Sequence, residues 1–293
     1  MITLKNDFFE IEILKRGVTF YTFKTLNDNK DIITGYKDMK NYEHNPHFLG
    51  SFVGPLSGRT EMNQYGMNLE PPNNLHSGSE GICFKEFDAE LLSNTQAIFT
   101  FDDRDIFYSI SIQLLDNKLI VNVLARPRKS MPINITNHMY FNLEESNTLK
   151  DHFIKLDALE YSHVDKDLFN QYDLRKVKNT VFDLNSMVPI KELLNRNHPQ
   201  FAITGHIDHS FKGNQVTLRT ETKQLKVTTT TPFIHLYFAN YFDQSFLDKK
   251  NRYAHNHASV AIEPQWLPND PNLPIYSSSN PFFETFVYEI TYI

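Results

Sequence analysis

The stretch Pro132-Ile133-Asn134-Ile135-Thr136-Asn137-His138-Met139-Tyr140-Phe141-Asn142-Leu143 alternates polar and apolar residues along most of its length. A period of two is typical of a β-strand, because successive side chains point to opposite faces of a sheet. On one face the predicted strand carries amides, a hydroxyl, an imidazole and a phenol, from Asn134, Thr136, His138, Tyr140 and Asn142. The other face is apolar except for Asn137. Such a polar face suits a neutral polyhydroxyl ligand, and an ordinary solvated strand explains it equally well.

The same alternation recurs through the rest of the chain and predicts antiparallel hairpins. Helical patterns are rare, and the main candidate is one short helix over 189–195 with a proline near its first turn. These patterns predict an all-β protein, a large antiparallel β-sandwich, with residues 1–293 in a single domain. The expected hairpins are Phe8–Leu14 with Val18–Phe23, Ile106–Leu114 with Leu119–Ala125, and Val216–Thr222 with Leu225–Thr231 turning at Lys223-Gln224; a last strand carries Phe286, Tyr288, Ile290 and Tyr292 on one face.

Composition narrows the class of protein. The net charge is −6 and there is no basic block, which argues against nucleic acid as a partner. The single cysteine, Cys83, excludes an internal disulfide framework and fits a reducing compartment. No apolar stretch is long enough for a membrane helix, and the first residues do not resemble a signal peptide. We therefore expect a cytoplasmic protein that does not bind membranes.

Chemistry-bearing residues stand out in a few loops and at strand ends. Arg59 ends a tight loop that starts at Gly54, and His76 lies in a turn rich in small polar residues. Asp208 lies between two histidines, and Glu263 follows an apolar strand that we expect Pro264 to stop. Each also has a purely structural explanation, such as a surface ion pair, a turn or a side chain that faces solvent.

Taken together, these residues form a pattern that resembles the aldose 1-epimerase (galactose mutarotase) family over most of the chain. The segment 137–143, Asn-His-Met-Tyr-Phe-Asn-Leu, is close to the family's Asn-His-x-Tyr-Phe-Asn-Leu strand. The other matches follow in the family's order: 54–60 resembles its Gly-x-x-x-Asn-Arg-Ile loop, 74–78 its Leu-His-Gly-Gly turn, 208–211 its Asp-His-x-Phe, and 263–265 its Glu-x-Gln before a Pro-Asp-Asn-containing loop.

The resemblance implies a galactose mutarotase-like supersandwich with an open sugar cleft, and an aldose 1-epimerase activity on a monosaccharide. It implies that Glu263 is the general base for the anomeric hydroxyl and His138 the general acid for the ring oxygen. Arg59, His76 and Asp208 would hold sugar hydroxyls. The reaction needs no metal, nucleotide or other cofactor. We expect the acid and base on opposite sides of the sugar, with a nearby carboxylate favouring the cationic form of His138.

This chain departs from the family pattern in several places. Gly58 replaces the usual Asn before the Arg, and Ser77 replaces the first Gly of the Gly-Gly pair. His235 stands where the family usually has Gln, which exchanges an amide for an imidazole in a predicted sugar contact. The interval between Arg59 and His76 is also shorter than usual. These changes concern sugar preference more than the acid and base.

Other functions remain open at this point. A glycoside hydrolase could use Asp208 and Glu263 as its two carboxylates, and a non-catalytic sugar-binding or sensor protein could share the fold. An epimerase of a phosphorylated or otherwise modified hexose could use the basic residues Arg126, Arg128 and Lys129. A metalloenzyme could use His206, His209, His255 or His257, although these lack a helix and a clear third ligand. The sequence leaves open whether the chain is a monomer or a homodimer.

Overall fold

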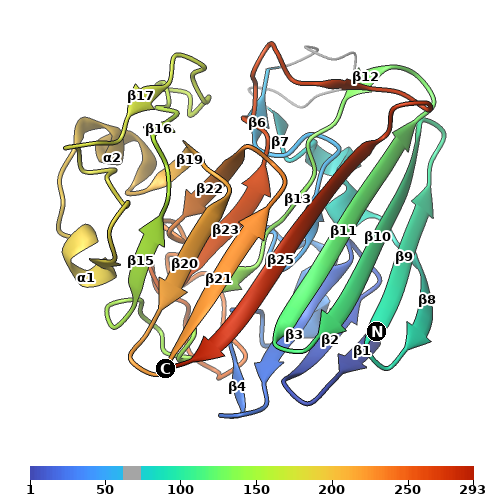
Figure 1. Ribbon diagram of the computed structural model, residues 1–293, viewed down its shortest axis with the longest axis horizontal. Helices are drawn as coiled ribbons and strands as arrows, with labels where there is room; N and C mark the ends of the chain where they lie inside the picture. Colours follow the sequence, from blue (N-terminus) through green and yellow to red (C-terminus); the bar gives the residue numbers. More distant parts are fainter. Residues whose placement is uncertain (62–73) are drawn as a thin grey trace.

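The computed structural model describes residues 1–61 and 74–293, and strands dominate this part of the chain (Figure 1). Within it, a nine-stranded sheet has the order β18-β15-β20-β21-β25-β11-β10-β9-β8 and a six-stranded sheet the order β14-β23-β22-β19-β16-β17. Every ladder between named strands in the described residues is antiparallel, which confirms the predicted antiparallel β-sandwich. In the large sheet the strands are β8 (Asp88–Ser93), β9 (Gln96–Asp102), β10 (Ile106–Leu115), β11 (Lys118–Pro127), β15 (Phe153–Leu156), β18 (Val188–Pro189), β20 (Gln215–Arg219), β21 (Lys223–Thr229) and β25 (Phe282–Tyr292).

The six-stranded sheet lies behind the large one in Figure 1, and smaller sheets extend the sandwich. The strands of the six-stranded sheet are β14 (Tyr140–Phe141), β16 (Glu160–Tyr161), β17 (Arg175–Lys176), β19 (Asp208–Lys212), β22 (Phe233–Tyr237) and β23 (Val260–Gln265). A four-stranded sheet holds β1 (Ile2–Lys5), β2 (Phe9–Leu14), β3 (Thr19–Thr25) and β4 (Lys30–Asp31). Short pairs join β12 (Met131–Pro132) to β24 (Ile275–Tyr276), β13 (Thr136–Asn137) to β5 (Phe52–Val53), and β6 (Arg59–Thr60) to β7 (Asn74–Leu75). The helical segments are α1 (Ile190–Leu193), α2 (Pro199–Thr204), η1 (Met39–Glu43), η2 (Gly78–Glu80) and η3 (Ile82–Phe84).

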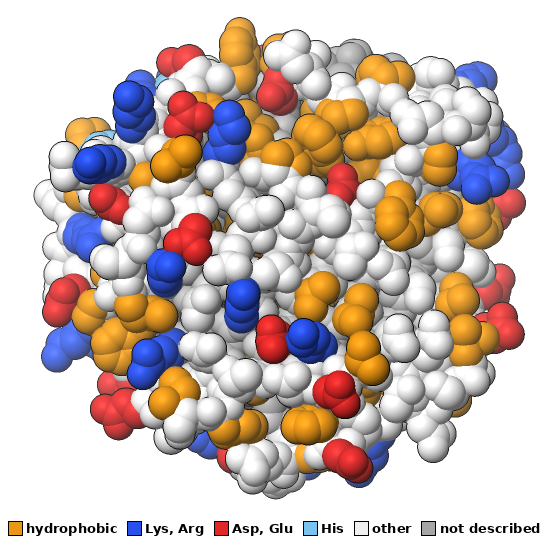
Figure 2. Space-filling model, viewed as in Figure 1, with side chains coloured by type: hydrophobic (Ala, Val, Ile, Leu, Met, Phe, Trp, Pro, Cys, Tyr) orange, Lys and Arg blue, Asp and Glu red, His pale blue; other side chains and the backbone are white. Residues whose placement is uncertain are grey.

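The core lies between the two large sheets because alternate residues of their strands point inward. Val121 and Val123 of β11 and Val260 and Ile262 of β23 are fully buried members of one hydrophobic cluster. Figure 2 shows the outer side of the large sheet, where hydrophobic side chains lie among charged and other polar ones. None of the described helices is long and apolar enough to cross a membrane.

Two of the three expected hairpins form as predicted, and the third has a shifted turn. β10 pairs with β11, and β2 pairs with β3. In the third, β21 begins at Lys223, so the prediction that Lys223-Gln224 forms the turn is wrong. The chain turns at Thr220–Thr222 instead, and the Thr220 N–H donates to the Lys223 carbonyl over 2.8 Å. Sequence alternation cannot fix this register, because Thr, Lys and Gln fit both a turn and a strand surface.

The helix expected over 189–195 is also shorter than predicted. It covers only Ile190–Leu193, and Pro189 is its extended N-cap residue rather than part of the first turn. The segment α2 was not predicted at all. Pro264 was expected to stop pairing, but the β22–β23 ladder continues through Pro264 to Gln265. The pairing of β14 with β23 extends only over Val260 and Ala261, so this proline interrupts no ladder on that side.

The segment 132–143 is not one continuous strand. It contributes to β12, β13 and β14, each of which pairs with a different strand. Its polar side chains therefore do not share one ligand-binding face: the Asn134 side chain bonds the Trp266 backbone, and Asn142 Nδ2 donates to the carbonyls of Ser146, Thr148 and Ala258. Only His138 and Tyr140 of the predicted polar face reach the cleft described below.

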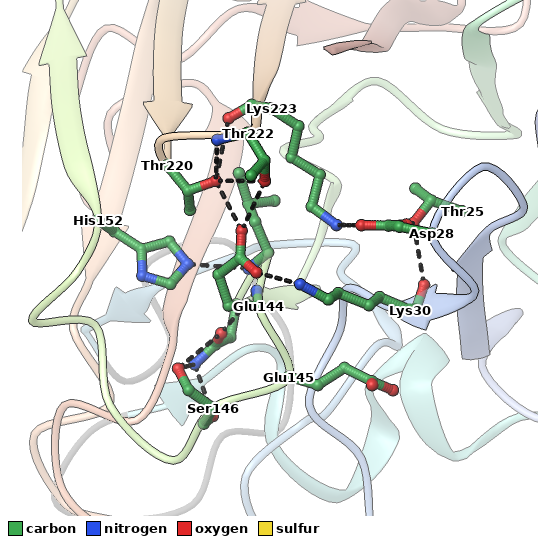
Figure 3. A network of polar contacts seen from close by, with 12 residues as sticks. Thr25, Asp28, Lys30, Glu144, Glu145, Ser146, His152, Thr220, Thr222 and Lys223 are labelled. Atoms are coloured by element: carbon green, nitrogen blue, oxygen red, sulfur yellow. Dashed lines mark hydrogen bonds and ion pairs between the residues drawn. The ribbon is translucent and has the colours of Figure 1, made fainter. Parts of the chain in front are cut away.

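A polar network ties the four-stranded sheet to the β20–β21 hairpin (Figure 3). The side chain of Lys223 is fully buried and pairs with Asp28, which also accepts hydrogen bonds from Thr25 and Tyr292. Glu144 pairs with Lys30 and accepts hydrogen bonds from the Thr220 and Thr222 hydroxyls at 2.7 and 3.1 Å. This network satisfies charges that would be costly to bury alone.

Candidate active site

One face of the six-stranded sheet forms the floor of a cleft of about 740 Å³. Odd-numbered residues of β22 and β23 and even-numbered residues of β14 and β19 point to this face, while their neighbours point into the core. As a result, His235 lies directly across from Glu263, and Asp208 lies across from Tyr237. The sheet thus places two carboxylates, an imidazole and a phenol together on a concave surface.

All six residues predicted for the site line this one cleft. They are Arg59, His76, His138, Asp208, His235 and Glu263. Asp208, His235 and Glu263 come from the sheet, whereas Arg59, His76 and His138 come from the loops and short strands at its edge. Three of the six, His76, His138 and Glu263, are at least 95% buried. The sequence also predicts that the loop Pro71-Pro72-Asn73-Asn74, rich in proline and asparagine, is a structured loop of the site, and its residues 71–73 lie outside the described residues.

The loop that carries His76 is fixed against the loop that carries Arg59. The Gly58 N–H donates to His76 Nδ1 over 3.0 Å, and the His76 N–H donates to the Gly58 carbonyl over 2.9 Å. His76 and Ser77 both have positive φ angles, of 53° and 69°. The Ser77 hydroxyl accepts from the Leu56 N–H at 2.9 Å and donates to the Leu56 carbonyl at 3.2 Å. These bonds hold a strained backbone in place at the cleft.

The His76 imidazole is neutral and has a fixed tautomer. Burial, with the neighbouring charges of His138 and Arg59, holds the pKa of His76 well below its ordinary value. A neutral imidazole has one nitrogen that accepts and one that donates. Because Nδ1 accepts from Gly58, we assign the proton to Nε2, which makes His76 a hydrogen-bond donor.

His138 occupies the break between β13 and β14. Its backbone is held by the segment Gly50-Ser51, since its N–H donates to the Ser51 carbonyl at 2.8 Å and its carbonyl accepts from the Gly50 N–H at 3.0 Å. The imidazole stacks on the Tyr140 ring with centroids 4.8 Å apart, and the Phe48 ring lies 6.0 Å away. These contacts restrict the orientation of the imidazole in the cleft.

His138 and Glu263 contact each other directly. His138 Nε2 lies 3.5 Å from Glu263 Oε1. The expectation that they share one pocket is met, but the expectation that they lie on opposite sides of a sugar is wrong, since 3.5 Å leaves no space for a ring between them. The anomeric oxygen and the ring oxygen of an aldose are both bonded to C1. Two groups that serve these oxygens can therefore lie close together.

Burial shifts the pKa values of this pair in opposite directions. Burial raises the pKa of the Glu263 carboxyl to about 7, the charge of Asp208 acts in the same direction, and the charges of His235 and Arg59 oppose it. Burial lowers the pKa of His138 to about 3, and the charge of His235 adds to this effect. As we expected, the charge of a nearby carboxylate, Asp208, favours the cationic form of His138, but burial outweighs it and favours the neutral imidazole in the empty site. The nearby carboxylates do not offset the desolvation of the imidazole.

His235 and Asp208 form a second pair in the cleft, joined by a hydrogen bond. His235 Nε2 lies 2.8 Å from Asp208 Oδ1, and Arg59 Nη1 lies 3.9 Å from Asp208 Oδ2. Burial acts to lower the pKa of His235, but its hydrogen bond to Asp208 and the charge of Glu263 raise that pKa above its ordinary value. Burial acts to raise the pKa of Asp208, but His235 and Arg59 bring it below its ordinary value. Where the family usually has a neutral amide, this chain places an imidazole with a raised pKa next to Glu263.

The cleft also contains a group of three side chains that could together hold a metal ion. Among the described residues, donor atoms of His76, His138 and Glu263 lie within 4.8 Å of one another. However, the one lone pair of neutral His76 already accepts a hydrogen bond from Gly58. A metal ion would have to break this bond, so the set fits a metal poorly.

Of the other histidines considered as metal ligands, His206 and His257 lie with ring centroids 5.6 Å apart, and His257 Nδ1 bonds the Phe238 carbonyl at 3.0 Å. His209 Nδ1 accepts from the Asp208 N–H at 3.0 Å, and its Nε2 lies 3.2 Å from Gln200 Oε1, so both ring nitrogens are engaged. His206 stacks on Phe201 with centroids 4.3 Å apart, and His255 is exposed. No metal site built on these residues is found in the described part of the chain.

Several cleft residues were not among the predicted site residues. Tyr237 and Gln265 lie two positions after His235 and Glu263 on the same strands, so strict alternation could have identified them. Gln265 is positioned by the Ser57 hydroxyl, which donates to its Oε1 over 2.8 Å. Phe48 and Asn170 reach the cleft from loops, and no sequence pattern indicated them.

Comparison with known proteins identifies the family. The family model for aldose 1-epimerase matches residues 1–279. Human galactose mutarotase is 26% identical over 300 residues, which cover 92% of this chain and 86% of that protein. The aldose 1-epimerase of Escherichia coli (strain K12) is 27% identical over 306 residues, which cover 94% of this chain and 88% of that protein. The chain belongs to the aldose 1-epimerase family.

Solved structures show the same fold. The galactose 1-epimerase of Lactobacillus acidophilus superposes with a TM-score of 0.88 at 24% identity, covering 99% of this chain and 93% of that one. An aldose epimerase homologue from C. elegans superposes with a TM-score of 0.89 at 22% identity, covering 100% of this chain and 98% of that one. The galactose mutarotase-like β-sandwich expected from the sequence is therefore confirmed.

Proposed function

We propose that this member of the aldose 1-epimerase family interconverts the α and β anomers of a free monosaccharide, and that Glu263 and His138 move the protons. The observation that carries the proposal is the contact of 3.5 Å between these two groups in a cleft lined by neutral and charged hydrogen-bonding side chains. Arg59, His76, Asp208 and His235 are the proposed partners of the sugar hydroxyls.

The chemistry requires two proton transfers at oxygens that share one carbon. Glu263 takes the proton of the anomeric hydroxyl, His138 gives a proton to the ring oxygen, and the C1–O5 bond breaks to form the open aldehyde. Rotation about C1–C2 and closure from the other face, with both transfers reversed, produce the other anomer. Protons balance over the cycle. Each well-placed proton-transfer group typically contributes about 10²–10⁴-fold.

The electrostatics of the site support this cycle. Ring opening leaves the proton on Glu263 and a neutral His138, which is the distribution that burial favours in the empty cleft. The burial of the two groups thus favours the protonation states that accompany the ring-opened intermediate, and forming this intermediate is the difficult part of the reaction. Exchange of the single proton between the two groups is possible across their direct contact.

The charges of the cleft favour a neutral sugar over a phosphorylated one. Arg59 and His235 are both directed at Asp208, so neither is a spare cation for a phosphate. Of the basic residues weighed for a phosphosugar, Arg128 pairs with Asp102 at 2.8 Å, and none of the three lines the cleft. The same engagement of Asp208 disfavours its use as the second carboxylate of a glycoside hydrolase.

Polarimetry on freshly dissolved α-D-glucose and α-D-galactose tests the proposal. The protein should accelerate the drift to anomeric equilibrium for at least one free aldose and should leave methyl glycosides unchanged. A Glu289→Gln variant, changed in β25 outside the cleft, is the matched control and should keep the wild-type rate. Release of methanol from a glycoside would indicate a hydrolase. Sugar binding without acceleration would indicate a binding protein.

A further inference from the structure

Asn170 is a cleft residue whose side-chain amide has no hydrogen-bond partner among the described residues. The residue lines the cleft and is 94% buried, since only 6% of its surface is exposed. Its Oδ1 is buried without a hydrogen-bond partner in the described residues, and neither end of the amide forms a hydrogen bond there. A buried amide oxygen in this state is unfavourable, because it has lost water and gained no donor in the described residues.

The loop around Asn170 is firmly held, so the free amide is not a sign of loose packing. Gln200 of α2 bonds both backbone groups of Val164, at 2.7 Å to its N–H and 2.9 Å to its carbonyl, and Val164 forms a bridge with Asn170. The Asp165 carboxylate accepts from the Phe169 N–H at 3.0 Å. The backbone around Asn170 is thus held by hydrogen bonds on both sides, while its side-chain oxygen, like His163 Nδ1 in the same loop, has no partner in the described residues.

We propose that Asn170 forms a hydrogen bond with one hydroxyl of the sugar and thereby selects among sugars. This inference rests on the proposed function. An amide can present its oxygen or its nitrogen to the cleft, because a half-turn of its last side-chain bond exchanges the two, and a sugar hydroxyl can both donate and accept. The amide gains its missing hydrogen-bond partner only when the sugar carries a hydroxyl at the matching position. A sugar that lacks this hydroxyl leaves the amide unpaired and is bound less well.

The test is a cycle of protein variants and deoxy sugars. The kcat/KM for anomer interconversion is measured for the preferred hexose and its 2-deoxy, 3-deoxy, 4-deoxy and 6-deoxy analogues. The proteins are the wild type, Asn170→Leu, which has a similar size without the amide, and Asn147→Leu, a matched change outside the cleft. With the wild type and with Asn147→Leu, one deoxy analogue should lose at least about 10-fold in kcat/KM. With Asn170→Leu, that loss should disappear, while the losses at the other positions remain.

Failure of the Asn170 inference and failure of the proposed function give different results in this experiment. If every deoxy analogue loses the same factor with Asn170→Leu as with the wild type, Asn170 contacts no hydroxyl and the inference is wrong. If the wild type accelerates no free aldose, the proposed function itself fails. Circular dichroism checks that the Leu variant is folded. Should it not fold, Asn170→Ala, which removes the amide without adding volume, is run through the same cycle and decides the question.

Discussion

His138 Nε2 lies 3.5 Å from Glu263 Oε1, and both side chains are almost completely buried in one cleft. This relationship couples their protonation, because a proton added to one group changes the charge next to the other. It also determines how each group should respond to substitution and to pH.

Replacing Glu263 with Gln or His138 with Asn should each lower kcat by about 10²–10⁴-fold, because each change removes one proton-transfer group and keeps a similar shape. Polarimetry with the preferred aldose measures the rate. The double variant should be only slightly slower than the worse single variant, because the two groups act in one step. Wild-type rates in both single variants, with circular dichroism unchanged, would contradict the mechanism.

The pH dependence should report the single proton of this pair. The pair holds one proton between pH values of about 3 and 7, set by the pKa values of His138 and Glu263. Above about 7 this proton is lost and no acid remains for the ring oxygen, so kcat/KM should fall as the pH rises through that value. Rates from pH 5 to 9, corrected for catalysis by buffer, test the sign, and a rise of kcat/KM through neutral pH would show that the site needs both groups deprotonated.

His235 provides a control for that assignment. The charge of His235 lowers the pKa of Glu263, so Glu263 should keep its proton to higher pH when the charge is absent. In His235→Gln, which restores the residue usual in the family, the fall in kcat/KM should therefore move to higher pH. An unmoved profile would mean that Glu263 is not the group that titrates.

Ser77 should act through the position of the His76 loop. Ser77→Ala removes both hydrogen bonds to Leu56 while the positive φ of 69° remains, and it should destabilise the protein by about 1–3 kcal/mol. Ser77→Gly removes the same bonds but relieves the backbone, so its loss should be smaller. Urea unfolding measures the difference. Equal stability of the two variants would show that the φ angle carries no strain.

Lys223 should be important for stability but not for activity. Lys223→Met leaves the Asp28 carboxylate without its buried cation, which should lower the free energy of unfolding by about 3 kcal/mol. Adding Asp28→Asn should recover part of this loss, because no unpaired charge then remains. Urea unfolding and polarimetry are measured on the same samples. A large loss of kcat in the folded Lys223→Met protein would count against a purely structural role.

Local patterns predicted most strands well where the polar and apolar residues alternate strictly. The pairing of β10 with β11 follows directly from such alternation. The segment 132–143 shows the opposite case, since it alternates and yet divides into pieces that pair with three different strands. The position of each break depends on which strand lies alongside, and that information is not local.

The residues of the candidate site could be named from the sequence because they lie in short motifs that resemble a family. Phe48 and Asn170 could not, because loops bring them to the cleft from positions without a pattern. The role of His235 was also only partly visible. The sequence shows an imidazole in place of an amide, but its charge depends on the Asp208 carboxylate 2.8 Å away.

The sequence by itself determined the strand-rich fold and the family resemblance, because these follow from residue type and spacing, and the resemblance in turn implied the proton-transfer groups that we propose. Only the tertiary structure decided that Glu263 and His138 touch, and that burial raises the pKa of the carboxyl and lowers the pKa of the imidazole. The physical reason is that desolvation and Coulomb interactions depend on depth and distance in the folded chain. Neither quantity can be read from the order of residues.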